Sequence, residues 1–241
     1  MKFILFIFAL AVVLGSCEKN EWERIAPEDK ILTNKAFLKI YNAVLGSPST
    51  NIFVDGTMVM GGTSPVGYTG LFPASVTYSS VEAGAHVIKV ADVAATPLLN
   101  ITANNNFEAG KYYTLFLYDT LNTAKSKLVQ DDIQVPADTT ARVRFGNFLF
   151  SSVAIPNMDI YSQRLKANVF SNIPVGEVTN YVNHPSKLQD TFYLRATGTT
   201  TNLNSVIFTP DQRRSYTLLG RGRYQTTSGT IVRTLTVMTN R

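Results

Sequence analysis

The sequence predicts an all-β protein with two tandem β-sandwich domains, and three observations support this prediction. No window holds a sustained 3.6-residue hydrophobic period, whereas many short segments alternate between apolar and polar side chains. Segments in the first half of the 241-residue chain recur in the second half about 105 residues later. The 14 Phe and 11 Tyr can bury enough surface to offset chain entropy, which excludes intrinsic disorder.

Cysteine and histidine are too scarce for several classes of site. The single Cys excludes a disulfide scaffold and any thiolate-rich zinc site. A zinc site or a Ser-His-Asp triad would have to depend on His86 or His184 alone. His86 lies in a predicted strand, and His184 precedes a proline with no second histidine nearby in the sequence. We therefore expect no metal and no cofactor.

Residues 1–16 are interpreted as an export signal and lie outside the predicted fold. A continuous apolar run from Phe3 to Leu14 is too short to span a membrane as a helix, because a span needs about 20 residues. The run ends in Leu14-Gly15-Ser16-Cys17, which resembles the lipobox of bacterial lipoproteins. That motif has an aliphatic residue, two small residues and the cysteine that receives lipid. The alternative is an ordinary secretory signal followed by a chance cysteine.

The lipobox resemblance implies that Cys17 becomes a lipidated N-terminus and that residues 17–35 are the cysteine and its tether. Several acyl chains contribute about 0.8 kcal/mol per buried methylene, so they would anchor the chain without a transmembrane helix. We expect an outer-membrane lipoprotein. Acidic residues directly after the cysteine loosely resemble a signal for the outer cell surface, so both the cell surface and the periplasmic face stay open.

Four blocks recur in the same order in the two halves of the chain. They are residues 38–42 with 143–147, 51–54 with 159–162, 77–78 with 180–181, and 113–115 with 216–218. We therefore place a first domain at residues 36–135 and a second at residues 136–241, each of a size usual for a β-sandwich. The join at residues 131–140 is short, so we expect the two domains to touch.

The first domain shows the alternation of a strand with one buried face. Leu38 and Ile40 fall on one face of the first strand, and Lys39 falls on the other. Asp55-Gly56 is a strong hairpin signal, because a type I′ turn needs positive φ at both central residues. Strands are predicted at residues 37–42, 51–54, 57–60, 86–90 and 112–118.

The second domain repeats the alternation of the first strand. Ala141, Val143 and Phe145 point inward, while Arg142 and Arg144 point outward. Further strands are predicted at residues 216–220, 224–227 and 230–238, with a turn at Ser228-Gly229.

Tyr113 and Tyr216 follow a turn closely and begin a late strand of each domain. This placement is typical of a tyrosine corner, in which the phenol bonds to upstream backbone and fixes a Greek-key crossing. An ordinary inward-pointing aromatic residue is the alternative.

These blocks resemble the bacterial family known as domain of unknown function 4397. Its members carry a first strand ending in Asn, a Val-Asp-Val-Tyr-like strand before a turn, and a Gly-x-x-Tyr-Thr strand. Residues 42, 52–56, 83–84 and 110–114 fit the pattern in the first domain, and residues 144–147, 158–161 and 216–218 fit it in the second. The second domain departs at His184-Pro185-Ser186-Lys187, which replaces a Gly turn. The resemblance implies immunoglobulin-like sandwiches in a cell-envelope setting and carries over no active site.

Charge is distributed unevenly between the domains. Residues 141–241 carry 12 basic and 4 acidic residues, whereas residues 31–140 carry 6 basic and 8 acidic residues. Arg213, Arg214, Arg221 and Arg223 concentrate this charge around one late hairpin and are the candidate anion-binding residues. We expect no nucleic acid, because an exported protein rarely meets it. An anionic glycan, lipid phosphate or an acidic partner fits better, and a solvated surface without a ligand is the alternative.

The predicted function is that of a non-catalytic, lipid-anchored envelope protein that binds a protein or glycan partner. The alternative is a carbohydrate-binding accessory protein, or a hydrolase of envelope or extracellular polysaccharide. A flat strip of exposed aromatics would favour glycan binding, and a deep cleft with two carboxylates would favour an enzyme. The second domain offers only Asp159, Glu177, Asp190 and Asp211 for such catalysis, and we assign no catalytic residue. The candidate glycan-binding residues are Tyr161, Tyr181, Tyr193 and Tyr224.

Overall fold

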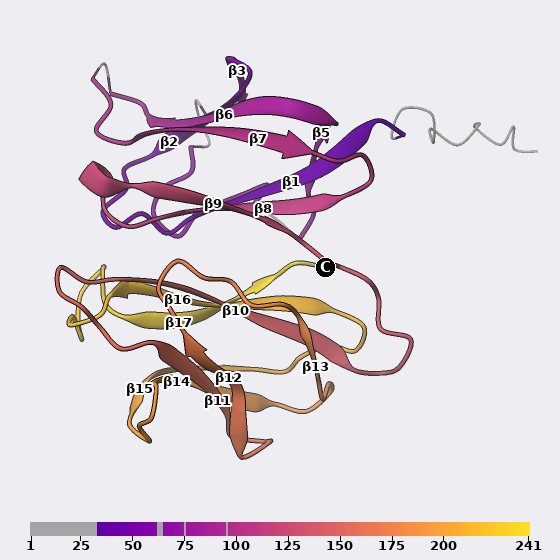
Figure 1. Ribbon diagram of the computed structural model, residues 1–241, viewed down its shortest axis with the longest axis vertical. Helices are drawn as coiled ribbons and strands as arrows, with labels where there is room; N and C mark the ends of the chain where they lie inside the picture. The colour runs from indigo at the N-terminus through magenta and orange to yellow at the C-terminus, as the bar shows by residue number, and fades with distance from the viewer. Residues whose placement is uncertain (1–32, 62–64, 75, 95) are drawn as a thin grey trace, which may run out of the picture. The chain divides into compact units, whose positions relative to one another are not determined.

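The computed structural model describes residues 33–61, 65–74, 76–94 and 96–241, and it confirms an all-β fold (Figure 1). The predicted export signal, the lipobox and Cys17 lie outside the described residues. In the part of the chain that the structure describes, the only helix is a short 3₁₀ turn, η1 (Leu121–Thr123). No helix there has the length and apolar character needed to cross a membrane. Residues 34–241 form one compact unit.

The first sandwich consists of two sheets. One sheet has the order β4-β1-β8-β9, with β5 also paired to β1, and the other has the order β3-β2-β6-β7. The strands are β1 (Lys35–Asn42), β2 (Thr50–Val54), β3 (Thr57–Met60), β4 (Leu71–Phe72), β5 (Ser79–Glu82), β6 (Gly84–Asp92), β7 (Asn100–Phe107), β8 (Tyr112–Tyr118) and β9 (Lys125–Gln130).

The second sandwich has the same plan. Its sheets have the orders β13-β10-β16-β17 and β12-β11-β14-β15. The strands are β10 (Ala141–Phe150), β11 (Met158–Ser162), β12 (Ala167–Ile173), β13 (Val182–His184), β14 (Asp190–Ala196), β15 (Asn202–Phe208), β16 (Ser215–Arg223) and β17 (Thr234–Thr239).

Equivalent strands of the two sandwiches pair in the same way. β1 pairs in parallel with β8, and β10 pairs in parallel with β16, while the other pairs of named strands are antiparallel. Leu38 lies opposite Tyr113 in the first sandwich, as Val143 lies opposite Tyr216 in the second. The chain therefore has two tandem immunoglobulin-like sandwiches. The boundary that we predicted after residue 135 falls in the segment between β9 and β10.

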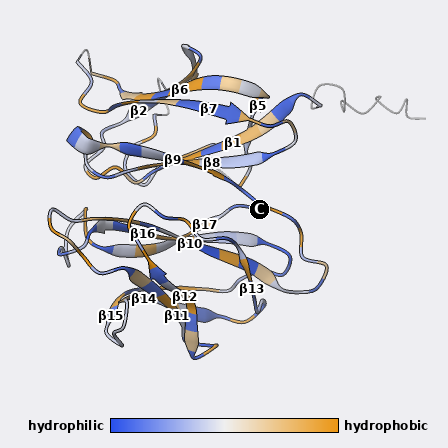
Figure 2. Ribbon diagram, in the orientation of Figure 1, coloured by the Kyte–Doolittle hydropathy of each residue, from blue (hydrophilic) through white to orange (hydrophobic). Residues whose placement is uncertain are grey.

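Each sandwich has its own apolar core, and the strands that face it alternate in hydropathy (Figure 2). Ile40, Ile52 and Leu115 are among the residues buried between the sheets of the first sandwich. Phe145 and Phe192 are buried in the second. Full burial of such side chains contributes about 1.5–3 kcal/mol each, which makes these two clusters the main source of stability.

Two predicted turn features are confirmed. Asp55 and Gly56 have φ values of 48° and 81°, as a two-residue hairpin between β2 and β3 requires. The Tyr113 hydroxyl accepts a hydrogen bond from the Glu108 N–H at 3.1 Å. The Tyr216 hydroxyl accepts one from the Asp211 N–H at 3.0 Å. Both tyrosines therefore form corners of the kind that the sequence indicated.

Some strands differ from the predicted ranges. The chain after Arg223 does not form the strand predicted at residues 224–227, and β17 begins only at Thr234. β7 and β9 carry no strong strand pattern, because residues with low strand preference, four asparagines in β7 and two lysines in β9, occupy many of their positions. Each pairs with a strongly patterned neighbour, β6 or β8, which supplies hydrogen-bond partners along its full length.

Candidate functional site

The two sandwiches meet through β1 and β8 on one side and β10, β16 and β17 on the other. Because β1, β8, β10 and β16 are covered on both faces, most of their residues are buried. Phe116 and Phe148 stack across this interface with ring centroids 4.8 Å apart and planes 27° apart. Tyr41, Leu219 and Met238 complete the apolar part. The prediction that the domains touch is thus confirmed.

A buried ion pair lies within this interface. The Arg144 guanidinium of β10 is 2.6 Å from the Asp131 carboxylate, and both side chains are almost fully buried. Asp131 Oδ2 also accepts hydrogen bonds from Thr114 Oγ1 at 2.5 Å and from the Tyr78 hydroxyl at 2.7 Å. The carboxylate is therefore satisfied from both sandwiches, as a buried charge must be.

An equivalent set of contacts starts from the second sandwich. Thr217 Oγ1 donates to Asn240 Oδ1 at 2.6 Å, as Thr114 does to Asp131 in the first sandwich. Asn240 Nδ2 then donates to the Tyr78 hydroxyl at 3.3 Å. Lys39 occupies on β1 the place that Arg144 has on β10, and its Nζ donates to the Thr239 carbonyl at 3.3 Å. The interface thus has approximate twofold symmetry, with Asp131 in one half and Asn240 in the other.

This asymmetry decides the electrostatics of the interface. Burial lowers the pKa of Lys39 to about 8. Asp131 opposes this effect, and the nearby Arg144 adds to it. Burial disfavours the charged form of Arg144, but Asp131 holds the pKa of Arg144 above its ordinary value. Burial and Asp131 together raise the pKa of Tyr78. The cluster therefore holds the two sandwiches in register.

The structure brings two of the four candidate tyrosines together. Tyr161 of β11 and Tyr193 of β14 lie opposite each other on the outer face of their sheet. Their ring centroids are 6.4 Å apart and the planes are inclined by 41°. The Arg195 guanidinium lies 3.7 Å from the centre of the Tyr161 ring, and its Nε donates to Asn202 Oδ1 at 2.7 Å. Arg195 was not among the predicted site residues.

Tyr181 and Tyr224 lie elsewhere. Tyr181 is in the sandwich interface, with the guanidinium groups of Arg142 and Arg144 5.1 and 4.6 Å from its ring centre. Tyr224 follows β16 and packs against the core of the second sandwich, and Arg233 lies 5.3 Å from its ring. The four tyrosines therefore do not form one flat strip.

The four candidate arginines are also divided. Arg213 and Arg214 precede β16 and are exposed, whereas Arg221 and Arg223 lie at its other end. A strand rises about 3.3 Å per residue, which separates the two pairs by roughly 25 Å. The four arginines therefore lie at the two ends of one strand of the β16–β17 hairpin, and they do not form a single cluster. Arg221 and Arg223 instead lie over aromatic rings at 5.5 and 5.0 Å.

Both histidines have carboxylate partners. His184 lies in β13 rather than in the predicted loop, and its Nε2 is 3.0 Å from Asp190 Oδ2. Burial lowers the pKa of His184 against the opposing effect of Asp190. His86 Nδ1 is 2.5 Å from Asp55 Oδ2. Among the residues that the structure describes, no group of three or more His, Cys, Asp and Glu side chains could hold a metal ion.

Three carboxylates that line surface grooves are engaged in ion pairs. A groove of about 410 Å³ beside the start of β8 is lined by Asp131 and Asp132. Asp131 pairs with Arg144, and Asp132 pairs with Arg142 at 2.7 Å. Asp119 lines another groove, of about 360 Å³, and pairs with Lys125 at 2.7 Å.

The sequence of residues 36–161 matches the family model described as a domain of unknown function, DUF4397. The chain belongs to the DUF4397 family. The matched region covers the first sandwich and continues through β10 and β11 of the second. No curated protein matches the chain at a significant level. The predicted family is therefore confirmed.

The motif residues of this DUF4397 chain have structural roles. Asn42 ends β1, and its Oδ1 accepts a hydrogen bond from the Val44 N–H at 3.0 Å. Asn147 holds the equivalent place in β10, and its Nδ2 donates to the Ile173 carbonyl at 2.9 Å. Together with the two tyrosine corners, these contacts fix the path of the chain between sheets.

Proposed function

We propose that this DUF4397 chain is a lipid-anchored, non-catalytic protein of the cell envelope that binds a protein partner. The binding surface in this proposal is the outer face of the β12-β11-β14-β15 sheet. The lipobox-like sequence at residues 14–17 supports the anchor and the envelope setting. The buried interface supports a rigid pair of sandwiches, on which a binding face keeps a fixed orientation.

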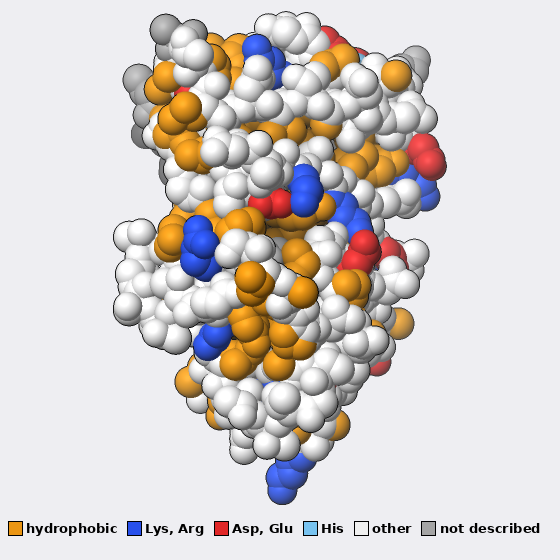
Figure 3. Space-filling model, turned by 60° about the vertical axis from the view of Figure 1, so that its left-hand side comes forward, with side chains coloured by type: hydrophobic (Ala, Val, Ile, Leu, Met, Phe, Trp, Pro, Cys, Tyr) orange, Lys and Arg blue, Asp and Glu red, His pale blue; other side chains and the backbone are white. Residues whose placement is uncertain are grey.

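The observation that carries the proposal is the group formed by Tyr161, Tyr193 and Arg195. Tyrosine and arginine are the residues that most often dominate the energy of protein interfaces. These three contact one another before a partner arrives, so little side-chain freedom is lost on binding. Ile207 adds an apolar side chain that is 57% exposed, opposite Thr191 on the same sheet. Figure 3 shows apolar side chains gathered over the second sandwich on one face of the unit.

A glycan is the second candidate partner. Asn202 lies beside Arg195, and the Asn168 amide donates to Asp159 at 3.0 Å next to Tyr161, so amides that suit sugar hydroxyls flank the tyrosines. The inclination of the rings and the guanidinium over Tyr161 are less favourable for stacking a flat sugar face. We therefore rank a glycan below a protein.

The engagement of the carboxylates supports a non-catalytic role. Asp159 accepts hydrogen bonds from the Asn172 N–H at 2.7 Å and from Thr197 Oγ1 at 2.7 Å. Asp190 is buried and accepts a hydrogen bond from Ser162 Oγ at 2.5 Å. Carboxylates held in this way have little capacity to shuttle a proton or attack a sugar.

The anchor is tested by metabolic labelling with a fatty acid that can be detected after gel separation. The wild-type chain should incorporate the label, and the Cys17→Ser variant should not. Labelling of the variant, or its absence in both chains, would contradict lipidation at Cys17.

The binding face is tested with a paired substitution. Tyr161→Ala with Tyr193→Ala should abolish cross-linking to envelope proteins, since it removes both aromatic anchors. Phe53→Ala with Lys89→Ala changes the outer face of the other sandwich, where Lys89 Nζ lies 5.8 Å from the Phe53 ring, and it serves as the control. If both variants cross-link like the wild type, the assigned face is wrong. A glycan array probed with the same three chains decides between the two classes of partner.

A further inference from the structure

The N-terminal tether meets the folded unit at the end where β8 begins. The Phe37 N–H donates to the Lys111 carbonyl at 2.9 Å, and the Gly110 N–H donates to the Lys35 carbonyl at 2.7 Å. Lys35 is the first residue of β1, so the chain enters the fold beside the turn that precedes β8. The position of this entry is determined by the strand pairing of the described residues.

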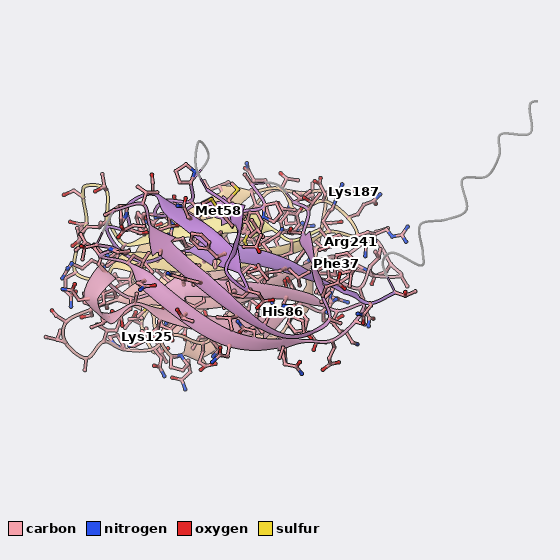
Figure 4. All side chains as sticks on the ribbon, turned by 90° about the horizontal axis from the view of Figure 1, so that it is seen from above. Phe37, Met58, His86, Lys125, Lys187 and Arg241 are labelled. Atoms are coloured by element: carbon pink, nitrogen blue, oxygen red, sulfur yellow. The ribbon has the colours of Figure 1, made fainter. Side chains whose placement is uncertain are left out.

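Two loops of the second sandwich lie at the same end. The segment between the sandwiches starts there, since the Asp131 N–H donates to the Tyr112 carbonyl at 2.7 Å. At its other end, the Thr140 carbonyl accepts a hydrogen bond from the Arg213 N–H at 2.7 Å. The Lys187 N–H in turn donates to the Pro210 carbonyl at 2.8 Å. Figure 4 shows Phe37, Lys187 and Arg241 toward one end of the unit and Lys125 toward the opposite end.

These loops carry three exposed cations, Lys187, Arg213 and Arg214, which we call the basic end. No described carboxylate forms an ion pair with any of the three. The nearby carboxylates of Asp138 and Asp211 form hydrogen bonds with the Thr140 and Tyr216 hydroxyl groups, and neither forms an ion pair with these cations. The basic end therefore presents cations to solvent from two adjoining loops.

The backbone at the basic end has an unusual conformation. Lys187 and Arg213 have φ values of 63° and 61°, in the left-handed region that favours glycine. Cationic side chains are kept at two positions where glycine would be less strained.

We propose that the basic end faces the membrane and binds the phosphate groups of anionic phospholipid headgroups. The orientation rests on the proposed lipidation of Cys17. Residues 18–34 span at most about 60 Å even when fully extended, so a lipid on Cys17 would keep this end within that distance of the bilayer. Each Lys or Arg near an anionic surface strengthens binding about fivefold, and tethering raises the local concentration of both partners.

The test uses residues 18–241, which lack both the apolar export signal and the cysteine, and vesicles of phosphatidylcholine with or without an equal share of phosphatidylglycerol. The chain should co-sediment with the phosphatidylglycerol vesicles at low salt and dissociate at high salt. Lys187→Glu with Arg214→Glu should weaken this binding at least about 20-fold. The control, Lys89→Glu with Lys125→Glu, has the same net charge and should bind like the parent chain.

A second variant separates binding from folding. Arg213→Gly removes one cation and also relieves a positive φ, so it should bind about fivefold more weakly while its melting temperature rises. Equal weakening by the two charge-reversal pairs would overturn the proposal in favour of a general charge effect. Failure of the parent chain to bind phosphatidylglycerol vesicles would overturn it as well. Lipidation of Cys17 is tested separately by fatty-acid labelling. A negative labelling result would therefore leave the vesicle-binding results unchanged.

Discussion

Lys39 and Arg144 occupy equivalent positions on β1 and β10, yet only Arg144 faces a carboxylate. Arg144 is 2.6 Å from Asp131, whereas Lys39 donates to the carbonyl oxygens of Val76 and Thr239. Backbone carbonyls stabilise an ammonium less than a carboxylate does, which is why burial lowers the pKa of Lys39 to about 8. The two cations therefore contribute to stability with opposite signs near neutral pH.

Lys39→Met is expected to stabilise the protein at neutral pH, by about 1 kcal/mol, because it removes a buried charge without a carboxylate partner. Arg144→Met is expected to cost about 3–5 kcal/mol, because it leaves Asp131 buried and unpaired. Urea unfolding of both variants measures the two effects. Lys89→Met, at an exposed position, is the control and should change little. Equal destabilisation by Lys39→Met and Arg144→Met would contradict this account.

The same substitution has a signature in pH. The folded pKa of Lys39 is about 8 and the ordinary value is 10.5, so the unfolded chain binds more protons between them. The free energy of unfolding should therefore rise with pH above about pH 8. Above about pH 10 the raised pKa of Tyr78 acts in the opposite direction, since tyrosine then ionises only in the unfolded chain. Lys39→Met should abolish most of this increase in the free energy of unfolding with pH. If the pH dependence is unchanged in the variant, the increase comes from another titratable group.

The tyrosine corners show how single strands are fixed in place. Tyr113 and Tyr216 stand at equivalent positions of β8 and β16, and each phenol bonds to the turn before its strand. Both strands lie centrally in their sheets, so a change in their entry would disturb the parallel pairing with β1 and β10. The corners therefore secure the strands on which the sandwich interface is built.

Tyr216→Phe should lower the free energy of unfolding by about 1 kcal/mol, because the Asp211 N–H loses its partner while the ring stays packed. Tyr113→Phe should have an effect of similar size through the Glu108 N–H. Denaturant titration gives the values. Tyr193→Phe, on the outer face, is the control. If it lowers the free energy of unfolding as much as the two corner variants do, the hydrogen bonds of the corners make no specific contribution to stability.

The local sequence pattern was sufficient to predict strands with strong apolar and polar alternation. It was insufficient to predict the less regular strands that pair with them. The range 112–118 predicted for β8 and the range 57–60 predicted for β3 are those of the structure. β7 was missed because its asparagines have low strand preference, and it forms through pairing with β6. The proximity of Tyr161 and Tyr193 depends on the register between β11 and β14, which no local pattern encodes.

The alternation of apolar and polar residues also predicted which face of a strand each side chain occupies, but it did not predict what that face contacts. Lys39 and Arg144 do point away from the sandwich cores, as the sequence indicated, but they meet the other sandwich instead of solvent. Tyr181 was a candidate glycan-binding residue, a role that needs an exposed ring, but it packs on Arg144. Contacts between domains depend on three-dimensional docking, which the hydrophobic period of single strands does not contain.

The unit as a whole combines three surfaces with different proposed roles. The inner sheets hold the sandwiches together, the outer face of β11 and β14 is proposed to bind a partner, and the basic end is proposed to face lipid. The basic end lies in the loop between β13 and β14 and in the loop between β15 and β16, whereas the tyrosine face runs along strands. A partner could thus reach the tyrosine face of a chain that rests on the membrane.

The unequal interface also restricts which sandwiches can join. Two copies of the second sandwich that met through β10 and β16 would enclose two Arg144 guanidinium groups with only Asn240 amides opposite them. Such a pair would confine like charges in a medium of low polarity, at a cost that apolar contact would not recover. The difference between Asp131 and Asn240 therefore favours pairing of the first sandwich with the second over pairing of two identical second sandwiches.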